Sequence, residues 1–508
     1  MSGTGGRSVA GDPVVGDLGR YDVIVVGAGV AGLCVAIEAA GAGRRVLVVE
    51  KTERLGGMLH IAGGEFSGAG TRRQAAHGID DDPERHWDEV MRLSHGRADP
   101  DLTWRTVRAQ GETVDWLDGL GFDFHPDSPG LIHGHEVYSV PRTYWGVDQG
   151  DSLLRVLERE LARWAPEQVR VLTGTRVTGT VLDDDDRIAG ITGITAHGPG
   201  SGETAEIVAH APAVVLATGG YDAEPGLRNR FLPPGCEDAM IACLDHATGD
   251  GLRLAEALGA AVSNNGIFLP VMGLIPDPGR PGFAVDYREA FIELPPAYRT
   301  PHEIWVNRAG ERFVPEDGTS PERRERALLE QPGLAMHIVW DQAIARAAEP
   351  LIRNGAGDWT RERFLEEQES GRWIVTAPTP EELAVRLGVD PAGLAATLRR
   401  YNEAVRAGHD PDQGRTTLPM TIDSPPYYGI TSTASSLLSR DGLQVTGDLA
   451  VLRRDGRPIP GLYAVGEVLG NDVFAGDNYV GGMSVTPAMT LGRALGGALG
   501  RALAADAS

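Results

Sequence analysis

Residues 21–51, YDVIVVGAGVAGLCVAIEAAGAGRRVLVVEK, decide the fold of this chain. The apolar runs predict a buried strand over 23–26, a helix that ends at about Ala40, and a second buried strand over 46–49. In such a unit the first glycine permits the tight turn, the second lets a pyrophosphate approach the backbone, and the third lets helix and strand pack closely. The turn holds these glycines at its first, third and sixth positions and consists of Gly27, Ala28, Gly29, Val30, Ala31 and Gly32.

Glu50 and Lys51 close this unit and complete the pattern of a dinucleotide site. A carboxylate at the end of the second strand is placed to accept hydrogen bonds from the ribose hydroxyls of adenosine. The free N–H groups and the partial positive charge at the helix N-terminus attract phosphates. Because strand, helix, strand and acid all occur where the site requires them, this stretch predicts an α/β, Rossmann-like nucleotide-binding domain.

Several later segments share one property: their backbone can lie close against a large ligand. The runs VVLATGG at 214–220 and GLYAVGE at 461–467 are typical of parallel strands that end at a ligand. Thr486 and Pro487 predict the start of a last helix, whose N-terminus would direct positive potential at the loop before it. The predicted cofactor contacts in these segments are Gly56, Gly57, Met58, Gly63, Gly64, Val177, Thr218, Gly219, Asp250, Gly466, Glu467, Gly482, Ser484 and Val485.

Composition excludes some classes of partner. The formal net charge of −24 argues against nucleic-acid and anionic-membrane partners, which select basic surfaces. No apolar run reaches the ~18 residues that would span a bilayer. Residues 1–20 lack the apolar core of a signal peptide, and we expect them to form a disordered tail. Because the three cysteines show no C-x-x-C spacing and no disulfide framework, we expect a cytoplasmic protein.

The amino-acid composition of the middle of the chain differs from that of both ends. From about residue 265, prolines interrupt the doubly wound pattern. At 508 residues the chain is expected to form more than one domain. We predict that residues 21–265 and 425–508 form one discontinuous domain and that residues 266–424 form an inserted α+β capping domain.

The loop over 122–150 is rich in His, Tyr and Trp, which favours either a pocket lining or surface packing. His133 and His135 could in principle bind a metal, but no third ligand follows at a suitable spacing. No metal site is therefore predicted.

A set of motifs occurs in one order along nearly the whole chain from residue 21 onward, and in that order it resembles the fumarate reductase and 3-ketosteroid dehydrogenase flavoproteins. The resemblance implies FAD as cofactor, a capping domain that closes over the flavin, and an active site between the two domains. It also implies a small-molecule substrate and an external electron donor or acceptor. The motifs are GAGVAG (27–32), EK (50–51), GGM (56–58), ATGG (217–220), GDG (249–251), GLYAVGE (461–467) and NYVGG (478–482).

Two further features of the sequence bear on the cofactors that the resemblance implies. No second G-x-G-x-x-G follows, so no internal NAD(P)H domain is expected. His60 lies three positions from where the covalent members of this family carry their histidine, so the resemblance implies non-covalent FAD.

Succinate and fumarate enzymes of this family resemble one another in cationic and histidine groups that hold a small dicarboxylate. This chain has their R-F-x-x-E motif at Arg312–Glu316. At the positions of the final-loop arginine and the proton-shuttling arginine, however, it has Tyr479 and Ser320. The region of the histidine pair contains Leu437–Ser439. Plain fumarate reduction is therefore not expected.

The ending around Tyr479 resembles that of ketosteroid Δ1-dehydrogenases, and tricarballylate dehydrogenases have a similar one. In the former a tyrosine hydroxyl and a glycine N–H hold the substrate carbonyl oxygen. A phenol that donates to a ketone acidifies the neighbouring C–H bond, which dehydrogenation requires. Tyr479 is thus expected to be the electrophilic contact, with a packing role beside the glycines as the alternative.

The residue that transfers the proton stays open at this point. Ketosteroid enzymes carry a tyrosine where this chain has Ser320, and a serine hydroxyl is a poor base without help. The candidates are Ser320, Tyr144, Tyr138, Tyr287, Tyr298 and Arg323.

The chain is therefore expected to be an FAD-dependent oxidoreductase of CH–CH groups that dehydrogenates or reduces a C–C bond next to a carbonyl, on an apolar or cyclic substrate. One alternative is a polycarboxylate substrate held by Arg142, Arg288 or Arg299. Another is an FAD-bound subunit without catalysis.

Overall fold

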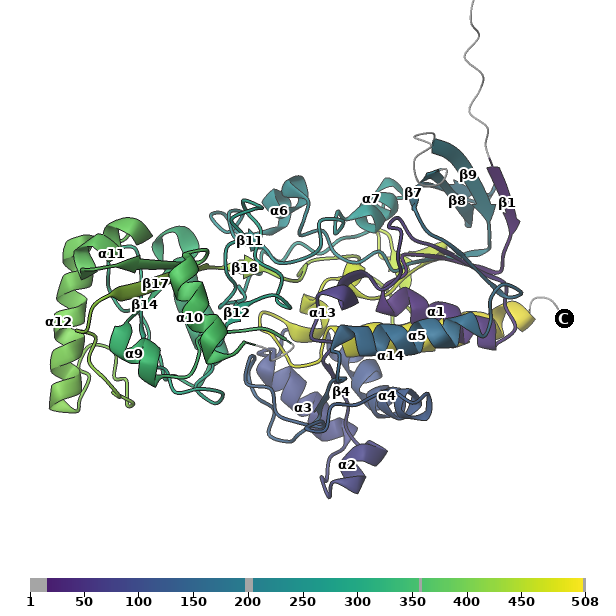
Figure 1. The fold of residues 1–508 in the computed structure, drawn as a ribbon. Helices are drawn as coiled ribbons and strands as arrows, with labels where there is room; N and C mark the ends of the chain where they lie inside the picture. Colours follow the sequence, from purple (N-terminus) through teal and green to yellow (C-terminus); the bar gives the residue numbers. More distant parts are fainter. Residues whose placement is uncertain (1–15, 197–203, 356–358, 506–508) are drawn as a thin grey trace, which may run out of the picture.

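The computed structural model describes residues 16–196, 204–355 and 359–505. Buried apolar side chains form two cores, one from the two ends of the chain and one from its middle. In Figure 1 the second core lies in the lobe that contains α9 to α12, well separated from the lobe around α1 and α14. Among the described residues, no helix combines the length and the apolar character needed to cross a membrane.

A six-stranded sheet forms the centre of the first lobe, in the order β19-β20-β10-β2-β3-β6. Its inner strands are parallel and apolar, and every residue of β2, β3 and β10 is buried. Parallel strands buried on both faces require such continuous apolar runs. The strands are β2 (Val23–Val26), β3 (Val46–Val49), β6 (Val169–Leu172), β10 (Ala213–Leu216), β19 (Ala450–Leu452) and β20 (Pro458–Ala464).

Helices cover this sheet, and the first and the last helix of the lobe pack against each other. Gly492 and Gly496 of the last helix lie so close to the first helix that an added Cβ would meet the carbonyl oxygens of Ala31 and Val35 at 2.8 and 2.4 Å. Glycine therefore permits this close helix contact. Figure 1 shows α1, α5 and α14 running alongside one another. The helices of the lobe are α1 (Val30–Gly41), α2 (Arg72–Ala76), α3 (Pro83–Leu93), α4 (Pro100–Gly119), α5 (Gly150–Ala162), α6 (Pro225–Phe231), α7 (Asp250–Ala257), α13 (Asp472–Ala475) and α14 (Val485–Ala505).

A smaller sheet, in the order β1-β9-β8-β7, lies at the edge of the first lobe. Residues 16–20, expected in a disordered tail, form β1 and pair in parallel with β9. The prediction of a disordered tail is therefore wrong for residues 16–20, because their pairing partner is distant in sequence and could not be recognised from local pattern. Residues 1–15, which belong to the same prediction, lie outside the described part of the chain. The strands are β1 (Gly16–Arg20), β7 (Thr175–Leu182), β8 (Ile188–Ala196) and β9 (Thr204–His210), and two short pairs elsewhere are β4 (Phe66–Ser67) with β5 (Thr143–Tyr144) and β11 (Met240–Ile241) with β18 (Ser435–Ser436).

The second lobe is built on an antiparallel sheet, β13-β14-β17-β16, covered by helices. Residues 427–433, expected to return to the first domain, form β17 in the middle of this sheet. The predicted boundary at residue 424 is therefore about ten residues too early for the sheet. The strands of this lobe are β12 (Phe291–Ile292), β13 (Ile304–Val306), β14 (Ala335–Asp341), β15 (Ile352–Arg353), β16 (Ile374–Ala377) and β17 (Tyr427–Thr433). Its helices are α8 (Pro321–Leu329), α9 (Gln342–Ala347), α10 (Arg361–Ser370), α11 (Pro380–Leu387) and α12 (Pro391–Ala407). Short 3₁₀ turns in the chain are η1 (Gly57–His60), η2 (Pro332–Leu334) and η3 (Glu467–Leu469).

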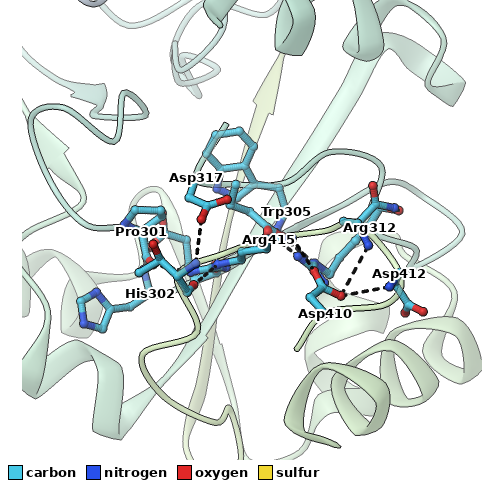
Figure 2. Close-up of polar contacts among 12 residues, drawn as sticks. Pro301, His302, Trp305, Arg312, Asp317, Asp410, Asp412 and Arg415 are labelled. Atoms are coloured by element: carbon cyan, nitrogen blue, oxygen red, sulfur yellow. Dashed lines mark hydrogen bonds and ion pairs between the residues drawn. The ribbon is translucent and has the colours of Figure 1, made fainter. Parts of the chain in front are cut away.

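The R-F-x-x-E motif is part of the packing of this lobe. The carboxylate of Glu316 is completely buried and pairs with Arg312 at 2.6 Å and with Arg415 at 3.3 Å. Arg312 also pairs with Asp410 at 3.0 Å, and Figure 2 shows this pair. Arg415 reaches the carbonyl oxygens of Pro301 and Glu303. The cluster therefore ties together segments that are about one hundred residues apart in the chain.

Replacing Glu316 should destabilise the second lobe. Glu316→Gln keeps the shape of the side chain but leaves two buried guanidinium groups without their shared counter-charge. We expect a loss of about 3 kcal/mol in the free energy of unfolding of this lobe, the size typical of breaking a buried ion pair. Calorimetry measures the effect, with the exposed Glu311→Gln as the matched control. Equal unfolding midpoints for the two variants would contradict the structural role.

Candidate active site

A cavity of about 650 Å³ lies between the carboxyl ends of the parallel strands and the second lobe. The turn after β2, the end of β3 and the end of β10 line it on one side. Residues 271–298 and the N-terminal part of α8 line it on the other side. Open α/β sheets bind ligands at this edge, because the helix N-termini and the strand ends meet there.

The glycine turn forms one wall of the cavity. Gly27 has φ of +101°, and a Cβ placed on it would lie 2.3 Å from the carbonyl oxygen of Ala217. A Cβ on Gly32 would lie 2.0 Å from the carbonyl oxygen of Gly27. At Gly29, in contrast, nothing lies within 4 Å of the Cβ position, and the residue lines the cavity. Two glycines thus permit the fold, and the third leaves its backbone open to a ligand.

Glu50 and Lys51 also line the cavity. The carboxylate of Glu50 accepts hydrogen bonds from the N–H groups of Ala28, at 2.9 Å, and Thr52, at 2.8 Å. Its position is therefore fixed before any ligand binds. Lys51 pairs with Asp250 at 3.0 Å, and this pair neutralises the lysine charge beside the cavity.

Every predicted cofactor contact apart from Gly32 lines this cavity. Gly32 lies behind the turn, where it permits the contact between helix and strand. The hydroxyl of Thr218 is buried and has no hydrogen-bond partner among the described residues, although the residue lines the cavity. A buried hydroxyl without a partner is costly, so a ligand oxygen or nitrogen at this point is favoured. His60 does not line the cavity, and its Nε2 lies 2.7 Å from the carbonyl oxygen of Leu55.

Tyr479 lines the other end of the cavity, but its hydroxyl already has a partner. The hydroxyl donates to the carbonyl oxygen of Leu269 at 3.0 Å. The guanidinium carbon of Arg440 lies 4.3 Å from the centre of the tyrosine ring, and the ring of His135 lies 5.3 Å away. Burial raises the pKa of Tyr479 to about 12. The phenol proton is therefore committed to the backbone and not directed at a substrate.

Arg440 brings a buried positive charge beside Tyr479, whereas His135 is neutral. Arg440 is 3% exposed, and its Nη2 has no hydrogen-bond partner within the described residues. Burial, together with the charge of Arg440, lowers the pKa of His135 to about 4. The histidine is therefore neutral at physiological pH and is no proton donor there.

Helix α8 contributes two charged side chains to the cavity, Arg324 and Glu325. Arg324 is 5% exposed, and its Nη1 donates to the carbonyl oxygen of Gly318 at 2.9 Å. Burial lowers the pKa of Arg324. Burial also raises the pKa of Glu325 to about 8, although Arg324 and Arg440 act in the opposite direction.

Ser320 and Tyr144, both expected to be catalytic, do not line the cavity. Ser320 is the N-cap of α8, where its hydroxyl accepts from the N–H of Arg323 at 3.2 Å and bonds to the carboxylate of Glu136. The hydroxyl of Tyr144 lies 2.6 Å from that of Thr71, and its side chain is completely buried. The structure thus gives no support to either prediction, because both hydroxyls serve the packing.

Of the remaining candidates for proton transfer, two do not line the cavity and two do. Tyr138 donates to the carbonyl oxygen of Gly481 at 2.8 Å and does not line the cavity, and Arg323 is exposed. Tyr287 and Tyr298 do line it. Burial raises the pKa of both, so neither phenol gives up its proton readily.

The arginines that could hold a polycarboxylate are all engaged elsewhere. Arg142 is completely buried between Asp81 and Glu89, at 2.7 and 2.8 Å. Arg299 pairs with Glu303 at 2.7 Å, and Arg288 pairs with Asp151 at 2.8 Å. None of these three arginines lines the cavity.

Sequence reasoning missed Arg324, Glu325 and Arg440. A signal for the first two was present, because the buried residues of α8 are Pro321, Arg324, Glu325 and Leu328. This spacing is that of the buried face of an amphipathic helix, and a charged pair on such a face points to a polar site. Arg440 lies shortly after Leu437 and Leu438 in an irregular segment, where no helical or strand periodicity identifies it as a buried residue.

Comparison with known proteins matches the chain with flavoproteins. A family model described as FAD binding domain matches residues 22–485. A probable fumarate reductase of Shewanella frigidimarina is 28% identical over 480 residues, which cover 93% of this chain and 74% of that protein. A vinyl phenol reductase of Lactiplantibacillus plantarum is 28% identical and covers 90% of this chain and 91% of its own length.

A solved structure is similar over nearly the whole chain. The 3-ketosteroid-Δ4-(5α)-dehydrogenase of Rhodococcus jostii RHA1, in complex with 4-androstene-3,17-dione, is 26% identical with a TM-score of 0.67. The match covers 95% of this chain and 97% of that one. The cavity suits FAD on structural grounds as well, because it combines the open backbone at Gly29, the preset carboxylate of Glu50 and the unpartnered hydroxyl of Thr218.

A side chain at Gly29 should block the cofactor without harming the fold. Gly29 has φ of −74°, a conformation open to any residue, and its Cβ position is free of protein atoms. We expect Gly29→Val to weaken FAD binding about tenfold or more, which is ~1.4 kcal/mol. Fluorescence titration of the apoprotein with FAD measures this change.

Gly27→Ala serves as the contrasting variant. Its added Cβ would collide with the backbone of Ala217, so it should lower the unfolding temperature of the apoprotein itself, whereas Gly29→Val should leave that temperature unchanged. Equal FAD affinity in Gly29→Val and the unmodified protein would show that the pyrophosphate does not pass this residue.

Proposed function

The chain belongs to the FAD binding domain family of flavoproteins and is an FAD-dependent oxidoreductase of CH–CH groups, and from this premise we propose that it acts on a C–C bond next to the carbonyl of an apolar or cyclic substrate. The observation that carries the proposal is the character of the cavity lining. The lining is more apolar than polar, and its apolar side chains include Ile132, Val271, Leu274, Leu294, Leu437 and Leu438. An uncharged ring or hydrocarbon skeleton is the ligand that such a surface selects.

Two carboxyl groups at the cavity oppose an anionic substrate. Burial raises the pKa of Glu65 to about 7 and also raises the pKa of Glu293, and both residues line the cavity. A dicarboxylate would bring negative charge close to these groups, and like charges in a buried site cost free energy. Arg142, Arg288 and Arg299, the arginines expected to hold a polycarboxylate, are engaged elsewhere.

Arg324 is the cation that we propose for the carbonyl end of the substrate. Its Nη1 is bonded to Gly318, while the rest of the guanidinium has no ion pair within the described residues. A charge fixed at this point stabilises the negative charge that develops on a carbonyl oxygen when the neighbouring carbon loses a proton or the other alkene carbon gains a hydride. Tyr479 would then form the wall beneath this end, since its own proton is directed at Leu269.

The relatives support a substrate with a ring. One is named a vinyl phenol reductase, and the solved ketosteroid dehydrogenase holds a steroid. The probable fumarate reductase shows that the family also includes enzymes named for a dicarboxylate. Local side chains, and not the fold, therefore decide the substrate.

The mechanism needs few protein groups. FAD, when bound, supplies hydride transfer to or from a substrate carbon. Arg324 orients the carbonyl and stabilises its charge. The second lobe excludes water, helped at the cavity mouth by Tyr298, which accepts a hydrogen bond of 2.9 Å from the N–H of His133.

We also propose an external electron donor or acceptor and a reducing, cytoplasmic setting. The three cysteines, Cys34, Cys236 and Cys243, are free thiols, which a reducing compartment maintains.

A substrate screen tests the proposal. The purified flavoprotein is reduced anaerobically, and its reoxidation is followed by flavin absorbance with cyclic and steroid-like enones, fumarate, tricarballylate and urocanate. We expect kcat/KM for the best cyclic enone to exceed that for each carboxylate by about 100-fold or more, the size of a lost charge contact. A higher value for fumarate or tricarballylate would overturn the proposal, as would reduced flavin that no enone reoxidises.

Arg324→Met should impair turnover because it removes the charge at the carbonyl end. We expect kcat/KM for the enone to fall by about 100-fold, as for the loss of one oxyanion donor. Arg323→Met is the matched control: it is the adjacent residue on the same helix, but it is exposed and does not line the cavity. Steady-state kinetics measures both variants. Similar kcat/KM values in the two would remove Arg324 from the mechanism.

A further inference from the structure

Reduction of a C=C bond needs a proton as well as a hydride, and neither Ser320 nor Tyr144 reaches the cavity to deliver it. We infer that the carboxyl group of Glu325 exchanges this proton with the substrate. The inference rests on the proposed function, because it assigns a further catalytic residue to the same site. It follows from the position, the burial and the surroundings of this side chain.

Glu325 lies on the buried face of α8, beside Arg324, and lines the cavity. It is 6% exposed, and within the described part of the chain neighbouring charges act on its carboxyl group, among them Arg324 and Arg440, but no hydrogen bond does. A buried carboxyl group without a partner is costly unless a ligand or a proton satisfies it. The side chain therefore has both the access and the need for a proton.

The charges around Glu325 set its protonation. Arg324, on the same helix, and Arg440, beside Tyr479, favour the carboxylate, while Glu136 and Glu322 oppose it. His135, which packs on Tyr479, is neutral. Burial dominates and raises the pKa of Glu325 to about 8, so the group is protonated at neutral pH and loses its proton as the pH rises above that value.

The step balances in both directions. In reduction, the carboxyl O–H bond of Glu325 breaks, its proton forms a C–H bond at the carbon next to the carbonyl, and the other alkene carbon receives a hydride from reduced FAD. The C=C bond becomes a single bond, and the flavin is oxidised by two electrons. In dehydrogenation, the carboxylate takes the proton from the carbon next to the carbonyl, and the hydride passes to oxidised FAD.

Glu136 and Glu322, whose charges act on Glu325, belong to a polar cluster at the start of α8. Glu136 accepts from the Ser320 hydroxyl and from the N–H of Glu322, at 3.3 Å. The carboxylate of Glu322 lies 3.4 Å from Nε2 of His95, which is half exposed.

Glu65 is the competing carboxyl group, because it also lines the cavity, and burial raises its pKa to about 7. It lies near Tyr287 and Tyr298, and its charge helps to raise the pKa of both. The two candidates predict different pH profiles, since activity should follow the titration of the group that carries the proton.

The test compares Glu325→Gln, Glu65→Gln and the exposed control Glu330→Gln, all as FAD-loaded proteins with the alkene that the unmodified enzyme reduces best. We expect the reductive kcat of the unmodified enzyme to fall as the pH rises through about 8. Glu325→Gln should lose about 100-fold or more of this kcat, as expected for a general acid, and also the inflection. Glu65→Gln and Glu330→Gln should keep the inflection near 8.

A second readout does not depend on turnover. Infrared difference spectra of the oxidised holoenzyme, recorded across the same pH range, should show a protonated carboxyl band that disappears near pH 8 and is missing in Glu325→Gln. If Glu325→Gln fails to bind FAD, Glu325→Asp replaces it. That variant keeps a carboxyl group at a shorter reach and should retain the inflection with a lower kcat.

The inference fails if Glu325→Gln retains more than about one tenth of kcat together with the inflection, or if Glu325→Asp equals the unmodified enzyme. It also fails if Glu65→Gln alone abolishes the inflection. These outcomes are separable from the proposed function. An enzyme that reduces an enone without Glu325 refutes only the proton assignment, while an enzyme that prefers fumarate but requires Glu325 refutes only the substrate.

Discussion

The contact between the first glycine turn and the end of β10 is the constraint on which the rest of the structure depends. Gly27 approaches Ala217 so closely that a Cβ would lie 2.3 Å from the carbonyl oxygen. Backbone hydrogen bonds from Gly27 to Val49 and from Ala217 to Val26, both 2.8 Å, hold the three strand ends level. This level edge is what allows Gly29, Glu50 and Thr218 to face one cavity. Helix termini and strand ends then supply polar contacts that a packed core cannot offer.

The second lobe completes the site because α8 is fixed from the first lobe. Glu136 accepts hydrogen bonds at the N-terminus of α8, and the amide of Asn478 donates to Glu322 at 3.0 Å. These contacts explain why Ser320 is used as a cap: its hydroxyl and the glutamate together satisfy the first turn of the helix. With the helix start fixed, the next turn places Arg324 and Glu325 at the cavity.

Charge is distributed unevenly around the cavity, and we propose that this distribution favours a neutral substrate over a dicarboxylate. The cations Arg324 and Arg440 gather near Tyr479, whereas Glu65 and Glu293 lie near Tyr287 and Tyr298. A neutral substrate with one polar oxygen can satisfy the positive end, and its hydrocarbon part can fill the rest. A similar protein is named a probable fumarate reductase, so we propose that side chains at the cavity, and not the fold, select the substrate.

The sequence by itself determined those features of the protein that depend on the pattern of neighbouring residues. Continuous apolar strands, the glycine turn and the acid after β3 act through neighbouring residues, and they were sufficient to predict the Rossmann-like domain and the glycine-turn and strand-end residues that line its cavity. The tertiary structure alone decided matters that join distant segments. It placed β17 in the second lobe, turned Ser320 into a cap, directed the Tyr479 hydroxyl at Leu269, and brought Arg440 over the ring of Tyr479. The physical reason is that the partner of a hydroxyl or a charge is set by packing between residues far apart in the chain, and no periodicity records that packing.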